Sequence, residues 1–188
     1  MDNNKIINNL FDESAHFILD SKKLTNQLSK IIEIIIDAYK NGNKVVIFGN
    51  GGSAADSQHF AAELIGRYRK ERRSLPAIAL TTDSSIITAL GNDYGFEYVF
   101  SRQCESIVKK NDIVFAISTS GNSPNVINGI ITSKKIGAIT IGLTGGDGGN
   151  LQRLVDYSLI VSSTSTARIQ EVHGTIIHII CELVEQYF

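Results

Sequence analysis

Five short apolar runs, spaced along the chain from residue 44 onward, constrain its fold more than any other feature. They are rich in β-branched residues and do not alternate between apolar and polar side chains. Such runs are typical of strands in a parallel sheet covered on both faces, and the helical stretches between them supply that cover. The predicted strands are Val45 to Phe48, Ala77 to Leu80, Ile113 to Ile117, Ala138 to Leu143 and Ser158 to Val161.

This alternation predicts a doubly wound α/β architecture, in which ligands bind at the carboxyl ends of the strands. A chain of 188 residues, 43% of them hydrophobic and 20% charged, is long enough to bury its own core. No internal repeat or linker divides the sequence. We therefore expect residues 1–188 to form a single domain.

The charge distribution gives little reason to expect a polyanionic partner. With a net charge of −1, the chain has no overall electrostatic attraction for nucleic acid or an acidic membrane, so we expect a small-molecule ligand. One basic run stands out, and its isolation in a near-neutral chain favours a solvated or interface-facing patch over a nucleic-acid site. The run consists of Arg67, Arg69, Lys70, Arg72 and Arg73.

Cysteine content and the N-terminal sequence indicate the cellular compartment in which we expect the protein. Cys104 and Cys181 are too few for a disulfide framework and form no CxxC motif, so we expect packed thiols in a reducing cytoplasm. The N-terminus lacks the basic start and apolar run of a signal peptide, and no stretch approaches the ~20 apolar residues that span a bilayer. These features predict a soluble cytoplasmic protein.

Residues 1–42 precede the first predicted strand. From about Lys5 to Lys40 they contain no Gly or Pro, which predicts one or two helices ended by Asn41-Gly42 as a C-cap. In the second half of this region apolar residues surround the helix, and such a helix must be buried on several sides. In a short chain, a second copy of the protein readily supplies the extra surface. We expect a homo-oligomer built through this segment, whose apolar residues are Leu28, Ile31, Ile32, Ile34, Ile35, Ile36 and Tyr39.

The loop after the first predicted strand, Gly49-Asn50-Gly51-Gly52-Ser53-Ala54, formally satisfies the dinucleotide fingerprint G-x-G-x-x-A. A dinucleotide site also needs an acidic residue about 20 residues further on, and the candidate Asp83 is too distant. The sequence contains no P-loop motif. The glycines therefore predict a tight strand-to-helix turn that lets a ligand approach backbone N–H groups.

A second loop, Ser118-Thr119-Ser120-Gly121-Asn122-Ser123-Pro124, follows the third predicted strand and opens a helix. Ser123 is a natural N-cap and Pro124 a natural first helical residue. Capping alone does not account for four hydroxyl groups. A phosphate monoester uses hydroxyls, backbone amides and a helix N-terminus together, so the loop favours a phosphate site.

Four further polar positions are less decisive. Asn92-Asp93 forms a polar break between apolar stretches. Asp93 either caps a helix that runs from about Phe96 or contacts a sugar hydroxyl, and the residues leave both alternatives open. For His16 and His173 we expect surface or structural roles.

Two pairs of polar side chains at helical spacing suggest an enzyme. His59 and Glu63 are four residues apart and point the same way. Gln170, Gly174 and His178 fall within about 80° of arc, and the glycine leaves an open notch between the polar groups. His59, Glu63 and His178 are standard zinc ligands, and Gln170 is a weaker one. Glu63 is alternatively a general base, a competing role because a bound cation makes a carboxylate a poorer proton acceptor.

Taken together, these motifs resemble those of a known family. They are Asn50-Gly51-Gly52-Ser53, His59 with Glu63, Asn92-Asp93, Ser118-Thr119-Ser120 with Ser123, and Gln170 with His178. Over essentially the whole chain they are similar to the phosphoheptose isomerases, also called sedoheptulose 7-phosphate isomerases. The resemblance implies the sugar isomerase (SIS) fold, a flavodoxin-like three-layer αβα arrangement with a five-stranded parallel sheet, plus N-terminal helices. It also implies a homotetramer with active sites between subunits.

The resemblance further implies reversible conversion of D-sedoheptulose 7-phosphate to D-glycero-D-manno-heptose 7-phosphate, the first step toward nucleotide-activated heptoses. Glu63 would move a proton between C1 and C2 through an enediol, and His178 would act as acid and base at the sugar oxygens. Ala167 stands where some members have an aspartate that reaches the sugar, so one hydroxyl contact is missing or replaced. The implied phosphate loop is Ser118, Thr119, Ser120 and Ser123, the residues that position the sugar are Asn50, Gly51, Gly52, Ser53, Asn92, Asp93 and Gln170, and the zinc site, with one ion per subunit, is His59, Glu63, Gln170 and His178.

Two non-enzymatic alternatives share the implied fold. One is a protein similar to the DnaA initiator-associating protein, a tetramer that binds the replication initiator DnaA. Residues 75–80 and 144–149 resemble that group. That protein lacks the acid/base pair, whereas this chain has both Glu63 and His178, which favours the isomerase. The other alternative is a regulator that senses sugar phosphates.

Overall fold

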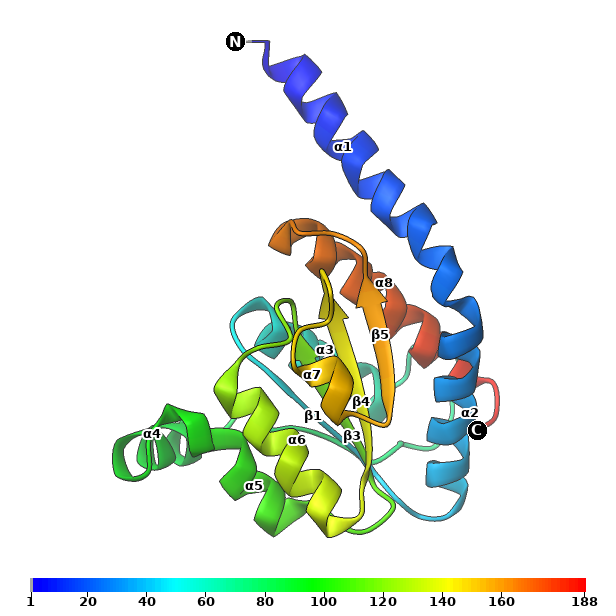
Figure 1. Cartoon of the computed structure of the whole chain (residues 1–188). Helices are drawn as coiled ribbons and strands as arrows, with labels where there is room; N and C mark the ends of the chain where they lie inside the picture. Colours follow the sequence, from blue (N-terminus) through cyan, green and yellow to red (C-terminus); the bar gives the residue numbers. More distant parts are fainter. Residues whose placement is uncertain (1) are drawn as a thin grey trace.

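The computed structural model describes residues 2–188, and Figure 1 shows how its elements are arranged. Within that range, five strands form one parallel sheet in the order β2-β1-β3-β4-β5. The predicted strands are confirmed, with ends close to those expected. They are β1 (Val45–Gly49), β2 (Ala77–Ala79), β3 (Ile113–Ser118), β4 (Ile139–Gly145) and β5 (Tyr157–Val161).

Helices cover both faces of the sheet, which confirms the three-layer αβα architecture. Neighbouring residues of each central strand point to opposite faces. Val45 and Ile47 pack with α2 (Thr25–Lys40), α3 (Gly52–Ile65) and α8 (Thr166–Glu185). Val46 and Phe48 pack with α5 (Val99–Ile107), α6 (Pro124–Ile136) and α7 (Leu151–Leu154). Both faces are therefore buried, as the apolar runs predict.

Two elements before α5 extend the body at the edge of the sheet. They are α4 (Ser84–Asp93) and the short 3-10 helix η2 (Phe96–Tyr98), and Asp83 caps the start of α4 by accepting a hydrogen bond from the N–H of Ile86. The predicted polar break at Asn92-Asp93 is wrong, because both residues belong to α4. Asp93 also caps no helix, since η2 begins after Gly95 and α5 after Tyr98.

The N-terminal region is helical, as predicted. It consists of α1 (Asn3–Asp20), the 3-10 helix η1 (Ser21–Leu24) and α2, and Gly42 follows with a left-handed φ of 78°. The sequence predicted that a second copy of the protein would cover the apolar residues of α2. Instead, the core of this chain covers that helix. The buried residues of α2 include Leu28, Ile31, Ile32, Ile35, Ile36 and Tyr39.

Helix α1 carries the uncovered apolar surface instead. None of its residues is buried, and Figure 1 shows it extending away from the body. Phe11 is 71% exposed and Leu19 58% exposed. Arg168 of α8 holds the middle of α1, because its guanidinium donates to the carbonyl of Leu10 and lies beside Glu13.

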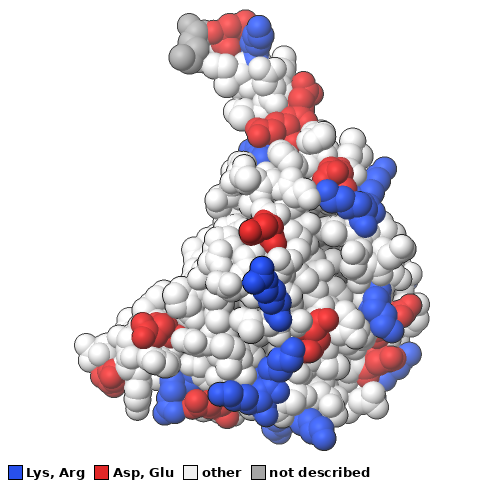
Figure 2. All heavy atoms as spheres, in the orientation of Figure 1, with Lys and Arg blue, Asp and Glu red and all other residues white. Residues whose placement is uncertain are grey.

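Charged side chains of both signs are interspersed on the face drawn in Figure 2, including the part formed by α1. No helix between residues 2 and 188 is long and apolar enough to cross a membrane. Cys104 and Cys181 are free and buried, as expected of packed thiols.

His173 has a structural position, since it lies fully buried between α8 and β4. Its Nε2 is 3.1 Å from the carbonyl oxygen of Thr144. Burial lowers the pKa of His173 to about 4, although the hydrogen bond with Thr144 acts in the opposite direction. The imidazole is therefore neutral in the folded protein at neutral pH.

This buried imidazole predicts a loss of stability in mild acid. The unfolded chain binds a proton at His173 below about pH 6.5, whereas the folded chain resists protonation down to a pKa of about 4. The stabilising contribution is complete above pH 6.5 and is lost as the pH falls toward 4, by on the order of 3 kcal/mol. Urea unfolding between about pH 7 and pH 4.5, at one protein concentration, should show a shallower decline for His173→Asn than for the wild type. Equal declines would show that His173 does not titrate in this way.

Candidate active site

The loop between β1 and α3 forms the predicted glycine turn. Gly51 has φ 56° and ψ −122°, a conformation that favours glycine, and α3 begins at Gly52. A Cβ atom at Gly52 would lie 2.2 Å from Nε2 of Gln170. The missing side chain therefore lets Gln170 of α8 approach the first residue of α3.

Further along the same two helices, three side chains converge. His59 Nε2 lies 3.0 Å from Glu63 Oε1, one turn later on α3. His178 Nε2 on α8 lies 3.4 Å from His59 Nε2, and the two imidazole rings meet edge to face with centroids 5.0 Å apart. The structure thus brings together segments of the chain that are 119 positions apart.

The predicted notch on α8 is open. A Cβ atom at Gly174 would have no neighbour within 4 Å. Gln170 lies at one end of the notch, against Gly52, and His178 lies at the other, against His59. The helix therefore presents two polar groups with free space between them.

The converging side chains fit a metal ion of the zinc type. One ligand atom from each of His59, Glu63 and His178 lies within 4.8 Å of the other two. Ligand atoms about 2.0–2.1 Å from a tetrahedral zinc lie about 3.3–3.4 Å from one another. The separation of 3.4 Å between the two imidazole nitrogens matches that spacing. Gln170, the fourth predicted ligand, makes no hydrogen bond to the other three among the described residues and lies against Gly52 instead.

Asp56 is an acidic neighbour of this cluster that the sequence did not single out. It lies one turn before His59 on α3, and its Oδ2 atom is buried without a hydrogen-bond partner within residues 2–188. Burial raises the pKa of Asp56, while the nearby His59 acts to lower it. A half-buried carboxyl group of reduced acidity thus adjoins the histidine pair.

The hydroxyl-rich loop lies between β3 and α6. Ser123 is the N-cap of α6 and Pro124 its first residue, as predicted, but the Ser123 side chain makes no capping hydrogen bond. Its Oγ lies 3.4 Å from Oγ of Ser118. The two hydroxyls therefore face each other at the start of the helix, a position suited to an anion. Thr119 is half-buried and Ser120 is exposed.

The loop between β4 and α7 supports the hydroxyl-rich loop from behind. The N–H of Gly145 donates to the carbonyl of Thr119, and the N–H of Leu151 donates to the carbonyl of Gly121. Gly121 has a φ of 63°, and a Cβ atom there would lie 2.1 Å from the carbonyl oxygen of Gly148. The segment 144–149 thus fixes the backbone of the hydroxyl-rich loop.

A pair of asparagines joins the two loops. Asn50 Nδ2 donates to Asn125 Oδ1 at 2.8 Å, and Asn125 Nδ2 donates back to Asn50 Oδ1 at 2.9 Å. Asn125 is buried in the first turn of α6, and the sequence reasoning missed it. The sequence feature that could have identified Asn125 is its position: it is a polar residue directly after Pro124, before the apolar residues of the helix begin.

Asn92 and Asp93 are not brought to the other predicted residues. They lie at the end of α4, where Asn92 Nδ2 donates to Asp93 Oδ1 at 2.8 Å. Figure 1 shows α4 projecting beside α5, away from α8. Within one chain, therefore, Asn50, Gly51, Gly52, Ser53 and Gln170 gather at the start of α3, and His59, Glu63 and His178 gather further along it.

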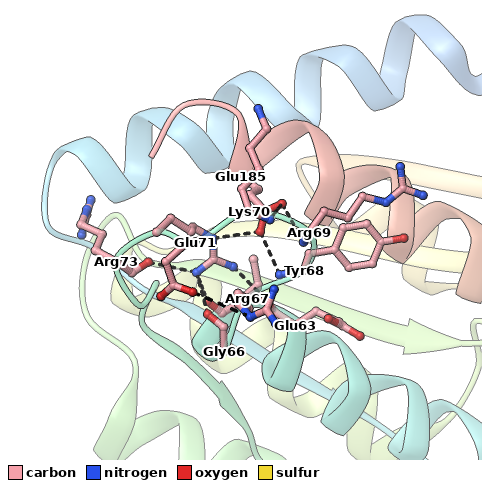
Figure 3. Close-up of polar contacts among 11 residues, drawn as sticks. Glu63, Gly66, Arg67, Tyr68, Arg69, Lys70, Glu71, Arg73 and Glu185 are labelled. Carbon is pink, nitrogen blue, oxygen red and sulfur yellow. Dashed lines mark hydrogen bonds and ion pairs between the residues drawn. The ribbon is translucent and has the colours of Figure 1, made fainter.

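The basic run is only partly a solvated patch, which corrects the sequence interpretation. Arg72 is buried, and its guanidinium lies 3.5 Å from the carboxylate of Glu185 on α8. The same carboxylate accepts hydrogen bonds from the backbone of the run, as Figure 3 shows. Arg72 was assigned to that patch and Glu185 was missed, because the sequence carries no local signal that pairs them.

Comparisons with known proteins agree with this geometry. The SIS domain profile matches residues 11–145. The phosphoheptose isomerase of Aquifex aeolicus is 54% identical over 181 residues, which make up 96% of this chain and 95% of that protein. The structure of a phosphoheptose isomerase from Francisella tularensis matches with a TM-score of 0.95 at 35% identity, covering 99% of this chain and 100% of that one. One from Neisseria gonorrhoeae gives 0.92 at 40% identity, covering 97% and 98%.

These matches span nearly the whole chain, well beyond the sheet alone. They include the helices that carry Glu63 and His178, and the family named in each relative is the one that the site motifs resemble. The chain therefore belongs to the phosphoheptose isomerase family of SIS-domain proteins.

Proposed function

We propose that this protein interconverts D-sedoheptulose 7-phosphate and D-glycero-D-manno-heptose 7-phosphate in the cytoplasm, as the first step toward nucleotide-activated heptoses. The observation that carries the proposal is the convergence of Glu63 and His178 from the two helices α3 and α8. A carboxylate and an imidazole at one site provide the two proton carriers that an aldose-ketose isomerisation needs. A protein that only binds the replication initiator or senses a sugar phosphate has no need of them.

In this reaction Glu63 removes a proton from C1 of the ketose and returns it to C2 of the enediol. His178 donates a proton to the oxygen on C2 and accepts one from the oxygen on C1. The protons balance, so the product is an isomer of the substrate. The reverse reaction uses the same groups in the opposite protonation states.

His59, Glu63 and His178 would hold a zinc ion, with Gln170 as a weaker fourth ligand, and His178 would then exchange protons only through the ring nitrogen that does not bind the ion. Bound there, zinc would act as a Lewis acid that polarises the carbonyl oxygen of the sugar. The nitrogen and carboxylate donors and their spacing support this assignment.

The two loops at the strand ends would hold the rest of the substrate. The hydroxyls of Ser118, Thr119, Ser120 and Ser123, with the start of α6, would bind the 7-phosphate. Asn50, Gly51, Gly52, Ser53 and Gln170 would position the sugar.

A homotetramer with active sites between subunits completes the proposal, with residues 1–42 as the assembling segment. The exposed apolar residues of α1 support such an interface. Asn92 and Asp93 lie apart from the site of their own chain, so a neighbouring subunit would use them to position its sugar.

The proposed reaction is tested directly by NMR. Purified protein incubated with sedoheptulose 7-phosphate in deuterated water should form the aldose and incorporate solvent deuterium at C1 or C2, because an enediol exchanges its proton. Aldose formation without any deuterium would contradict the enediol route. A protein that leaves the ketose unchanged but binds the replication initiator would favour the alternative.

Substitution of the proton carriers should abolish most turnover. General acid and base groups contribute about 10²–10⁴-fold, so Glu63→Gln and His178→Asn should each lower kcat by at least about a hundredfold. Their circular dichroism should match that of the wild type. Glu105→Gln, at an exposed carboxylate of α5 that pairs with Arg102 of the same helix, is the matched control and should retain full turnover. Near-normal kcat in either site variant would refute its role.

The phosphate site predicts a selective loss of binding. The double variant Ser118→Ala and Ser123→Ala removes two facing hydroxyls, so it should weaken binding of sedoheptulose 7-phosphate by about tenfold or more. Binding of unphosphorylated sedoheptulose should change much less, as measured by calorimetry or inhibition. An equal loss for both sugars would place the phosphate elsewhere.

A further inference from the structure

A buried carboxylate ties the end of α8 to the segment that follows α3. Glu185 accepts hydrogen bonds of 2.8 Å from the backbone N–H groups of Tyr68, Arg69 and Lys70. Figure 3 shows these three donors arranged around one carboxylate. A segment held by three charge-assisted hydrogen bonds has little freedom to move relative to α8.

Arg72 extends this arrangement to the end of α3. Its guanidinium donates to the carbonyl of Glu63 at 2.8 Å and to the carbonyl of Leu64 at 2.9 Å, which are groups that a helix end leaves without partners. Arg72 and Glu185 form an ion pair in which each side chain is only 2% exposed. We call Glu185, Arg72 and the backbone of residues 68–70 the Arg72–Glu185 network.

The charge state of Glu185 agrees with this geometry. Burial raises the pKa of its carboxyl group, but the three backbone donors and Arg72 outweigh burial and hold that pKa below its ordinary value. The carboxylate is therefore ionised at neutral pH. It keeps its full capacity to accept the three hydrogen bonds.

The network touches both proposed proton carriers. Arg72 binds the carbonyl of Glu63 itself, and Glu185 lies about two helical turns beyond His178 on the same face of α8. Tyr68, whose N–H is one of the three donors, places its ring 5.6 Å from the imidazole of His178 at an angle of 33°. A second aromatic ring thus packs near the imidazole, in addition to that of His59.

We propose that the Arg72–Glu185 network, through Tyr68, positions the imidazole of His178 relative to Glu63. The inference rests on the proposed function for the roles of those two residues. Glu185 and Arg72 fix the end of α3 against α8, and the Tyr68 ring restricts rotation of the His178 side chain. Nε2 of His178 is thereby kept toward His59 and Glu63. Tyr68, Arg72 and Glu185 are positioning residues, since none of them is required to touch the sugar.

An exposed ion pair between the same two segments provides a matched control. Arg69 Nη1 lies 2.8 Å from Glu182 Oε1, with side chains 65% and 41% exposed. Exposed pairs contribute little, because water screens the charges. Glu182→Gln should therefore leave turnover and folding unchanged, although it lies one turn before Glu185.

The kinetic test compares Tyr68→Leu, Tyr68→Phe and Glu185→Gln with Glu182→Gln. Misplacement by about 1 Å costs up to about a hundredfold in rate, so Tyr68→Leu and Glu185→Gln should lower kcat by about tenfold to a hundredfold. KM should change little, because the phosphate loop lies elsewhere. Tyr68→Phe, which keeps the ring, should resemble the wild type. Unchanged kcat per folded molecule in Tyr68→Leu and Glu185→Gln would overturn the inference.

A second readout does not depend on turnover. The chain has 4 histidines, so the ring signals of histidine-labelled protein are few, and the signal lost in His178→Asn identifies His178. Glu185→Gln keeps the Tyr68 ring but should release it, and should therefore shift the His178 signal. Glu182→Gln should not. If wild-type protein fails to isomerise the heptose while these shifts occur, the proposed function fails and the positioning stands.

Failure of one variant to fold does not remove the test. Tyr68→Leu leaves the three backbone donors and Arg72 in place, so it disturbs the ring contact without dismantling the network. A His178 signal that stays unmoved in every folded variant would overturn the inference, even if those variants were less stable.

Discussion

The close approach of α8 to α3 is the constraint on which the rest of the site depends. Glycine makes that approach possible at two places. Gly52 leaves room for the side chain of Gln170, and a Cβ atom at Gly145 of β4 would lie 2.3 Å from Cδ1 of Ile169. With either space filled, α8 would have to move outward, and the contact between His59 and His178 would open. Two residues without side chains thus determine where His59 and His178 can meet.

Apolar packing holds α8 against the sheet, but burial alone is non-directional and does not fix how the helix is rotated about its axis. Polar contacts fix that rotation. His173 bonds to β4 in the middle of the helix, and Glu185 binds the segment after α3 near its end. Arg168 binds α1 near its start. Each contact requires one particular face of α8, so together they aim Gln170 and His178 at α3.

The sequence predicted what depends on local pattern and missed what depends on distant partners. The strands and the serine at the start of α6 follow from short apolar runs and from capping preferences. Helix α4 was missed because Asn92 and Asp93 were assigned to a polar break, although both lie in its last turn. Arg72 was assigned to a solvated patch because its neighbours are basic. Its actual partner is Glu185, which is remote in the sequence. The same carboxylate binds the N–H of Tyr68, 117 positions before it.

The geometry of Glu63 bears on whether one carboxylate can serve both a metal ion and proton transfer. A nearby cation lowers the basicity of a carboxylate, so it matters which oxygen faces the metal ligands. Here Oε1 faces His59 at 3.0 Å, whereas Oε2 makes no hydrogen bond among the described residues. The Glu63 side chain is 25% exposed, which leaves that second oxygen able to accept a proton. Under the proposed function the two roles would divide between the two atoms, with Oε1 in the histidine cluster and Oε2 as the proton acceptor.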